Sequence, residues 1–254
     1  GAFLFAKAIS EDELQTQEVE SGRYWEHYTN HPEYSTATNA FKIPYQEITC
    51  MAADTSTDYL WLIFAGRHLA RMRMVRRIEK VDGKNVTVER PDWQMLHKFV
   101  PWADGERLNV IWFSGGKIYI GSSQGFYILE NPESEDMKGN PFSWQHYGVF
   151  HGLSIPEVRG FAWWHAQKGK LLAIMHNQGI STWDGKNFTK IETGGDNTCI
   201  KSGSDGNLWV GTTKGLNRID PTGEMFLYTT VNAHFMSDVI TAVGVVPGEN
   251  NSIG

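Results

Sequence analysis

A serine in a glycine-flanked turn is the first candidate for chemistry in this chain. Residues 121–125 read GSSQG, which fits the G-x-S-x-G pattern of a nucleophile elbow. That elbow requires a strand, a strained turn and then a helix. Here a second strand-like run follows, and residues 211–215 (GTTKG) repeat the same register without a serine. The pattern therefore predicts a repeated turn, and we assign no catalytic residue.

The nine histidines do not predict a metal centre. No H-x-x-x-H pair falls on an expected helix, and no CxxC occurs. We expect His151 and His165 in loops or in a channel. Asp196, Asp205 and Asp220 fall at turn positions rather than forming an acid/base pair. The sequence therefore predicts neither a metal nor a cofactor.

Aromatic, cationic and amide side chains suggest a binding surface instead. Indole rings can cover the C–H face of a sugar, while arginine and amide groups bond its hydroxyls. The expected loops and inner strands place six such residues on one face or in a channel. We therefore predict a site for a small molecule or an oligosaccharide; for Trp163 the alternative is packing between sheets. The predicted ligand-binding residues are Trp102, Arg159, Trp163, His176, Gln178 and Lys214.

A strand–turn–strand repeat must position these residues, and it is clearest at residues 205–220 (DGNLWVGTTKGLNRID). Asp205-Gly206 is a tight-turn signal, and the apolar run that follows suggests a strand buried on both faces. Gly211 allows close backbone approach, and Gly215 suits a left-handed turn position. The unit is a β-meander.

The unit recurs at 117–128, at 170–183 and, degraded, at 59–72. Periods of roughly 40 to 50 residues with strand patterning are typical of propeller blades. We therefore expect an all-β chain, a β-propeller of about five four-stranded antiparallel blades in one domain spanning 1–254. Either one blade is shared between the two ends, or the chain is a fragment of a longer propeller. The expected blades are about 45–100, 108–149, 157–193 and 196–230, with a composite blade from 1–29 plus 236–254.

Composition narrows the class of protein. The chain has 254 residues and a net charge of −6, which argues against a nucleic-acid partner. No run of about 18 apolar residues occurs, so no membrane segment is expected. Cys50 and Cys199 precede two of the repeats at equivalent positions, and such positions rarely bring two Cβ atoms within bonding distance. The cysteines do not identify the redox compartment.

Residues 67–90 depart from the regular unit. Several arginines and Lys80 lead up to Asp82-Gly83, and a β-prone run returns from it, so we predict a long β-hairpin. It is either a basic surface for a protein partner or a solvated edge kept soluble by its charge.

Residues 205–220 resemble the two-component regulator propeller repeat, D-x-x-G-x-L-W-x-G-T-x-x-G-L-x-R. Residues 237–240 and 153–158 also resemble the "S-x-x-V" start of that repeat. The resemblance implies a periplasmic or extracellular sensor domain that detects polysaccharide breakdown products. No kinase, DNA-binding or membrane segment accompanies the repeats, and the blades are fewer than in the family's long sensor arrays.

Three functions follow from these observations. The first is a non-catalytic ligand-sensing propeller of a two-component signalling protein. The second is a propeller enzyme, because the same run also resembles the streptogramin lyase repeat, although its His/Glu and metal site cannot be placed here. The third is a structural propeller that binds a protein partner, or a second copy, through the basic hairpin.

Overall fold

A computed structural model describes residues 47–54, 58–81, 83–96, 101–130, 132 and 144–245. Over these residues the regular structure is antiparallel β, with one short 3-10 turn, η5 (Val149–His151). The all-β antiparallel prediction is confirmed. The chain divides into two compact units after His97, and each is described by itself. The expectation of one domain over 1–254 stays a prediction.

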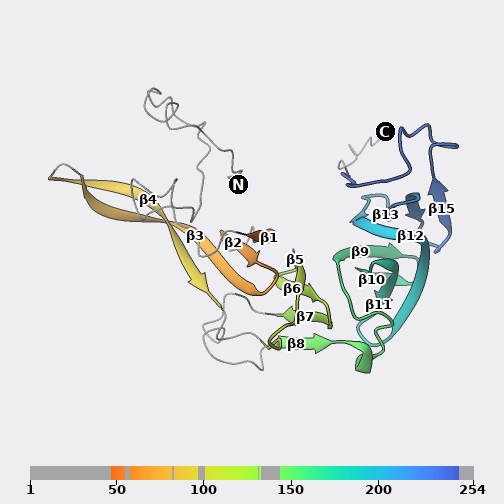
Figure 1. Ribbon diagram of the computed structural model, residues 1–254, viewed down its shortest axis with the longest axis horizontal. Coiled ribbons are helices and arrows are strands. Elements are labelled where there is room, and N and C mark those ends of the chain that lie inside the picture. The colour runs from red at the N-terminus through yellow and green to blue at the C-terminus, as the bar shows by residue number, and fades with distance from the viewer. Residues whose placement is uncertain are drawn as a thin grey trace, which may run out of the picture. The chain divides into compact units, whose positions relative to one another are not determined.

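The first compact unit contains one sheet of four strands in the order β1-β2-β3-β4. Its core is an apolar cluster of Leu62, Phe64, Ala70 and Met72 from β2 and β3. The predicted long hairpin is β3 and β4, which run beyond the other two strands (Figure 1). The strands are β1 (Ile48–Asp54), β2 (Tyr59–Phe64), β3 (His68–Val81) and β4 (Lys84–Met95).

The second compact unit begins with another four-stranded sheet, in the order β5-β6-β7-β8. Two-residue turns, such as 123–124 between β6 and β7, join its first three strands. This sheet matches the clear repeat that the sequence shows at 117–128. The strands are β5 (Leu108–Ser114), β6 (Lys117–Ser122), β7 (Gly125–Leu129) and β8 (Trp144–Tyr147).

The remaining strands form one seven-stranded sheet in the order β15 to β9. The sequence places a blade boundary at 193–196. β12 runs without a break through these residues, and it changes its partner strand there (Figure 1). Its first part pairs with β11 and its second part, from Asn197, pairs with β13. The strands are β9 (Gly160–Ala166), β10 (Gly169–Met175), β11 (Gln178–Trp183), β12 (Phe188–Ser202), β13 (Leu208–Thr212), β14 (Gly215–Ile219) and β15 (Met225–Tyr228).

Strand β9 shows how the sheets stack, because alternate residues contribute to two different cores. Phe161 packs with Tyr119 of the β5–β8 sheet, whereas Ala162 and Trp164 pack with Val210 of β13. Successive side chains of a strand point to opposite faces. A strand that is apolar at every position is therefore buried on both faces, as the sequence predicts for these runs.

Glycines of the repeat lie where the chain passes close to itself. A Cβ at Gly211 would stand 2.5 Å from Cys199 Sγ and 2.9 Å from Ile240 Cγ2, which explains the glycine there. Gly215 has φ +131°, as its turn position predicts. Gly66, the glycine of the degraded repeat at 59–72, instead lies inside a three-residue turn, because Phe64 pairs with His68.

The ends of the predicted composite blade, 1–29 and 246–254, lie outside the described residues. Residues 236–245, the described portion of the second half of that predicted blade, form no strand in the structure. Their backbone still bonds the preceding sheet, since Ile240 N–H donates to Thr212 O at 3.0 Å. A β-strand needs a neighbouring strand with which to pair, and no such strand lies beside this segment among the described residues.

Candidate functional site

The serine turn is structural. Ser122 is buried, and its Oγ lies 3.1 Å from Gly125 O and accepts the N–H of Gln124 at 3.1 Å. Thr212 makes the same two contacts at the same register, with Gly215 O at 2.8 Å and with Lys214 N–H at 3.0 Å. Because a threonine makes the same contacts in another repeat, the Ser122 hydroxyl holds the turn.

Backbone hydrogen bonds join each of these turns to the part of the chain that follows its sheet. Val158 N–H donates to Ser122 O at 2.8 Å, as Ile240 does to Thr212 O. Asn109 Nδ2 in turn donates to Val158 O at 3.0 Å. The bonded segments form one edge of the second compact unit, which we call the turn edge. It consists of residues 106–109, 122–125, 157–159, 176–179, 196–198 and 212–215.

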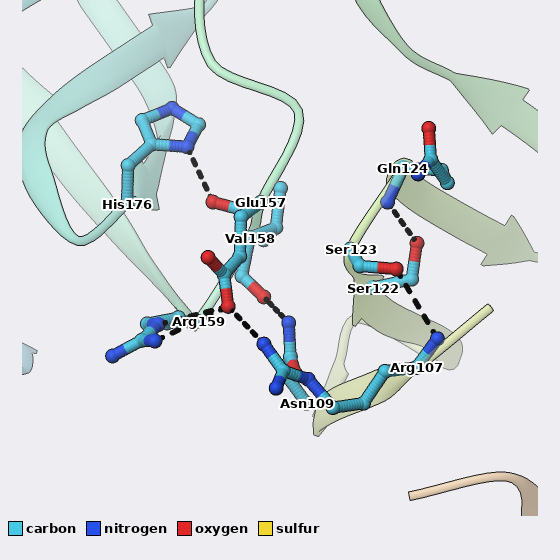
Figure 2. Close-up of polar contacts among 9 residues, drawn as sticks. All are labelled: Arg107, Asn109, Ser122, Ser123, Gln124, Glu157, Val158, Arg159 and His176. Carbon is cyan, nitrogen blue, oxygen red and sulfur yellow. Dashed lines mark hydrogen bonds and ion pairs between the residues drawn. The ribbon is translucent and has the colours of Figure 1, made fainter. Parts of the chain in front are cut away.

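Glu157 is the centre of an ion-pair cluster on the turn edge (Figure 2). Its Oε1 accepts from Arg107 Nη2 at 2.5 Å and from Arg159 Nη2 at 3.2 Å. The two arginine side chains are 59% and 40% exposed, so both guanidinium groups remain accessible to a ligand. The other oxygen, Oε2, has no hydrogen bond among the described residues.

An amide–carboxylate group follows along the same edge. Gln178 Nε2 donates to Asp196 Oδ1 at 2.9 Å, and Asn177 Nδ2 lies 3.3 Å from the same oxygen. The backbone N–H of Asp196 donates to Thr213 Oγ1 at 3.2 Å. Lys214, the next residue along the chain, is exposed. The edge thus offers alternating donors and acceptors.

His176 belongs to the turn edge through its backbone, but its side chain is buried beneath the surface of that edge. Its Nδ1 lies 2.9 Å from Glu157 O, and its Nε2 lies 2.8 Å from Ser181 Oγ. A carbonyl only accepts, so Nδ1 carries the proton and Nε2 accepts from the serine. Burial lowers the pKa of His176 against the opposing effect of its bond to Glu157 O. The ring therefore supports the segment that carries Glu157.

Glu106 anchors the loop that carries Trp102 and Arg107. Its buried carboxylate accepts from Ser122 Oγ at 2.5 Å and from Tyr127 Oη at 2.9 Å. Burial, together with the charge of Glu106, raises the pKa of Tyr127. The ring of Trp102 packs edge-on against the ring of Tyr127, with 5.6 Å between the ring centres. Contacts with the β5–β8 sheet therefore hold the loop at both of its ends.

Trp163 lies away from the turn edge. Its Nε1 donates to Ser114 Oγ at 2.6 Å, and Lys170 Nζ lies 4.3 Å from the centre of its ring. It packs against the core cluster between the β5–β8 sheet and β9–β11. It lies four positions along the extended chain from Arg159, roughly 13 Å.

The structure thus brings Arg159, Gln178 and Lys214 to one edge, with His176 beneath it and Trp102 on the adjoining loop. Neither Arg107 nor Glu157 is among the ligand-binding residues predicted from the sequence. A signal existed, because Arg107, Glu157 and Asp196 occupy equivalent positions in three repeats. An alignment of the repeats on their first strands, rather than on their glycine-containing turns, places these three residues at one position.

Asp205 and Asp220 lie in turns, as predicted, but the turn prediction for Asp196 is wrong, because Asp196 lies inside β12 and pairs with Gln178. Asp220 Oδ1 accepts the N–H groups of Thr222 at 2.8 Å and Glu224 at 3.0 Å. A bond from the Thr222 hydroxyl is the first cause that lowers the pKa of Asp220. Among the residues that the structure describes, no three His, Cys, Asp or Glu side chains gather as metal ligands. The described part of the chain also has no helix long and apolar enough to span a membrane.

Comparison with known proteins gives structural likenesses at low sequence identity. No protein-family model matches the chain, and no curated protein matches it. It is similar over 72% of its length to the extracellular domain of BT4673, a candidate one-component system of B. thetaiotaomicron, at 15% identity and TM-score 0.40. Over 77% it is similar to PorZ, a surface component of the type-IX secretion system of Porphyromonas gingivalis, at 12% identity and TM-score 0.48.

A third similar structure is a gluconolactonase, XC5397 of Xanthomonas campestris, which matches 73% of the chain at 16% identity and TM-score 0.41. The matches cover 30%, 29% and 60% of the BT4673, PorZ and XC5397 chains respectively. The chain therefore spans less than two thirds of the length of each.

Proposed function

We propose that this chain is part of a β-propeller that binds a polyhydroxylated small molecule, such as an oligosaccharide, at its turn edge without catalysis. The observation that carries the proposal is the exposed cluster in which Arg107 and Arg159 share one oxygen of Glu157. The resemblance of residues 205–220 to a sensor repeat extends the proposal to a periplasmic or extracellular sensor of a two-component system.

The propeller part of the proposal rests on how the sheets follow one another. Val158 and Ile240 make the same backbone bond to the preceding sheet. Tyr119 and Phe126, which a following sheet covers, are 4% and 0% exposed. Their equivalents in the last sheet, Trp209 and Leu216, are only partly buried, beside an open pocket of about 390 Å³. A further blade over this face would complete their burial.

The chemistry of the edge suits a neutral ligand with many hydroxyls. A hydroxyl both donates and accepts, so it can bond a guanidinium and a carboxylate together. The edge holds as many anionic as cationic groups, which gives a strongly charged ligand no net attraction. The three anionic and three cationic residues are Glu106, Glu157, Asp196, Arg107, Arg159 and Lys214.

A thermal-shift screen of the chain against oligosaccharides and divalent metal ions tests the proposal. We expect one glycan class to stabilise the chain saturably, by about 2.7 kcal/mol at a hundredfold excess over Kd. Arg159→Ala should abolish this stabilisation. Arg76→Ala should not, although Arg76 also pairs with a glutamate, Glu89, at 3.1 Å.

Each contrary outcome is informative. Stabilisation by a metal ion alone would favour the propeller enzyme over the sensor. No stabilisation by any glycan, or an equal loss in the Arg159→Ala and Arg76→Ala variants, would contradict ligand binding at the turn edge.

A further inference from the structure

The β3–β4 hairpin continues beyond its own sheet as a two-stranded ribbon (Figure 1). β2 pairs with β3 only from His68 to Met72, whereas β4 pairs with β3 as far as Val81. Residues 73–81 and 84–92 therefore form a ribbon that no third strand joins in the described part of the chain. Both long edges of this ribbon can accept another strand.

The ribbon has little stabilisation of its own. Arg76 pairs with Glu89 at 3.1 Å and Arg77 with Asp92 at 2.9 Å, and all four side chains are about half exposed or more. Exposed pairs of this kind contribute about 0–1 kcal/mol each, and an isolated two-stranded hairpin is marginally stable in water. Ile78 is 72% exposed. An added strand would supply a hydrogen-bond ladder and cover apolar surface.

Charge indicates what kind of strand would bind. Residues 73–92 contain six basic and four acidic side chains, a net charge of +2 in a chain whose total is −6. At the tip, Lys80 and Lys84 are exposed and make no ion pair with another described residue. A second copy of the ribbon would bring the same positive charges, which disfavours self-pairing and favours an acidic partner.

We propose that the ribbon binds an acidic polypeptide segment, which adds as a third strand along the outer edge of β4. Pro91 has no N–H group, so pairing is confined to the residues that precede it, from Lys84. This mode of recognition takes affinity from main-chain bonds and selectivity from side chains. It goes beyond the proposed ligand binding, since it uses no residue of the turn edge.

The test uses the full chain and two labelled ten-residue peptides, one alternating Glu and Val, the other Lys and Val. We expect saturable binding of the Glu-Val peptide, at least about tenfold tighter than the Lys-Val peptide and weaker at high salt. Hydrogen exchange should slow at residues 84–90 on binding.

Matched variants complete the experiment. The double variant Lys80→Glu with Lys84→Glu should weaken binding of the Glu-Val peptide by about tenfold or more. The control, Lys168→Glu with Lys186→Glu, changes two exposed lysines of the second compact unit and should leave binding unchanged. Equal affinity for both peptides, binding of neither, equal loss in both variants, or dimerisation of the chain instead would each overturn the proposal. None of these outcomes bears on glycan binding at the turn edge.

Discussion

The burial of His176 makes the folding stability of the chain depend on pH. Its pKa lies below the ordinary value because burial disfavours the charged ring. Between the folded-state pKa and about 6.5, the unfolded chain binds more protons than the folded chain. The contribution of this residue to stability is therefore complete above about pH 6.5 and is lost as the pH falls below it.

We expect His176→Asn to reduce the pH dependence of stability below pH 6.5. Between the folded-state pKa of His176 and about pH 6.5, each unit by which the pH falls lowers the free energy of unfolding of the wild-type chain by up to about 1.4 kcal/mol through this group. The measurement is urea denaturation between pH 7.5 and 5, monitored in the second compact unit. His146→Asn, which changes an exposed histidine, is the control. An unchanged pH slope in His176→Asn would show that the buried ring does not titrate on unfolding.

At the scale of elements, β12 holds two halves of the seven-stranded sheet together through one buried amide. Asn197 Nδ2 donates to Gly179 O at 2.7 Å and to His176 O at 3.1 Å, and its Oδ1 accepts from Thr193 Oγ1 at 2.7 Å. These bonds join β12 to β11 and to the turn before it. They hold β12 at the point where its partner strand changes from β11 to β13.

Asn197→Leu keeps the side-chain size but leaves buried acceptors without a donor. We expect it to destabilise the second compact unit by about 2–4 kcal/mol, since each unmet buried group costs about 1–3 kcal/mol. Asn187→Leu, at an exposed turn position, should change stability by less than about 0.5 kcal/mol. Equilibrium denaturation of both variants checks this. Equal, small effects would mean that water replaces the lost donor.

At the scale of the whole molecule, the second compact unit contains its own cores. The cluster around Phe126 and Phe161 and the cluster around Trp164 and Val210 draw only on residues after Lys98. We expect the fragment 98–254 to fold alone, with a near-ultraviolet circular dichroism spectrum of fixed aromatic packing and a cooperative denaturation. A fragment lacking either property would show that the first compact unit is required for its folding.

The sequence by itself determined most strands and turns of the described part of this chain, and which of those strands are buried on both faces. Strand alternation, paired glycines and turn aspartates are local, so the repeats at 117–128 and 205–220 predict their strands directly. Local patterns also predicted the long hairpin, because its turn and flanking strands are contiguous in sequence.

Only the tertiary structure decided which side chains meet. Arg107 and Glu157 are 50 residues apart, and their ion pair depends on how one sheet stacks on the next. Trp163 packs against a core cluster because of the face to which its strand turns it, and a one-residue change of register reverses a face. The buried ring of His176 depends on its contacts with Glu157 O and Ser181. The point at which β12 changes its partner strand is likewise held by Asn197, which bonds groups on a neighbouring strand. Such contacts arise from packing between sheets, which residue spacing along one chain does not specify.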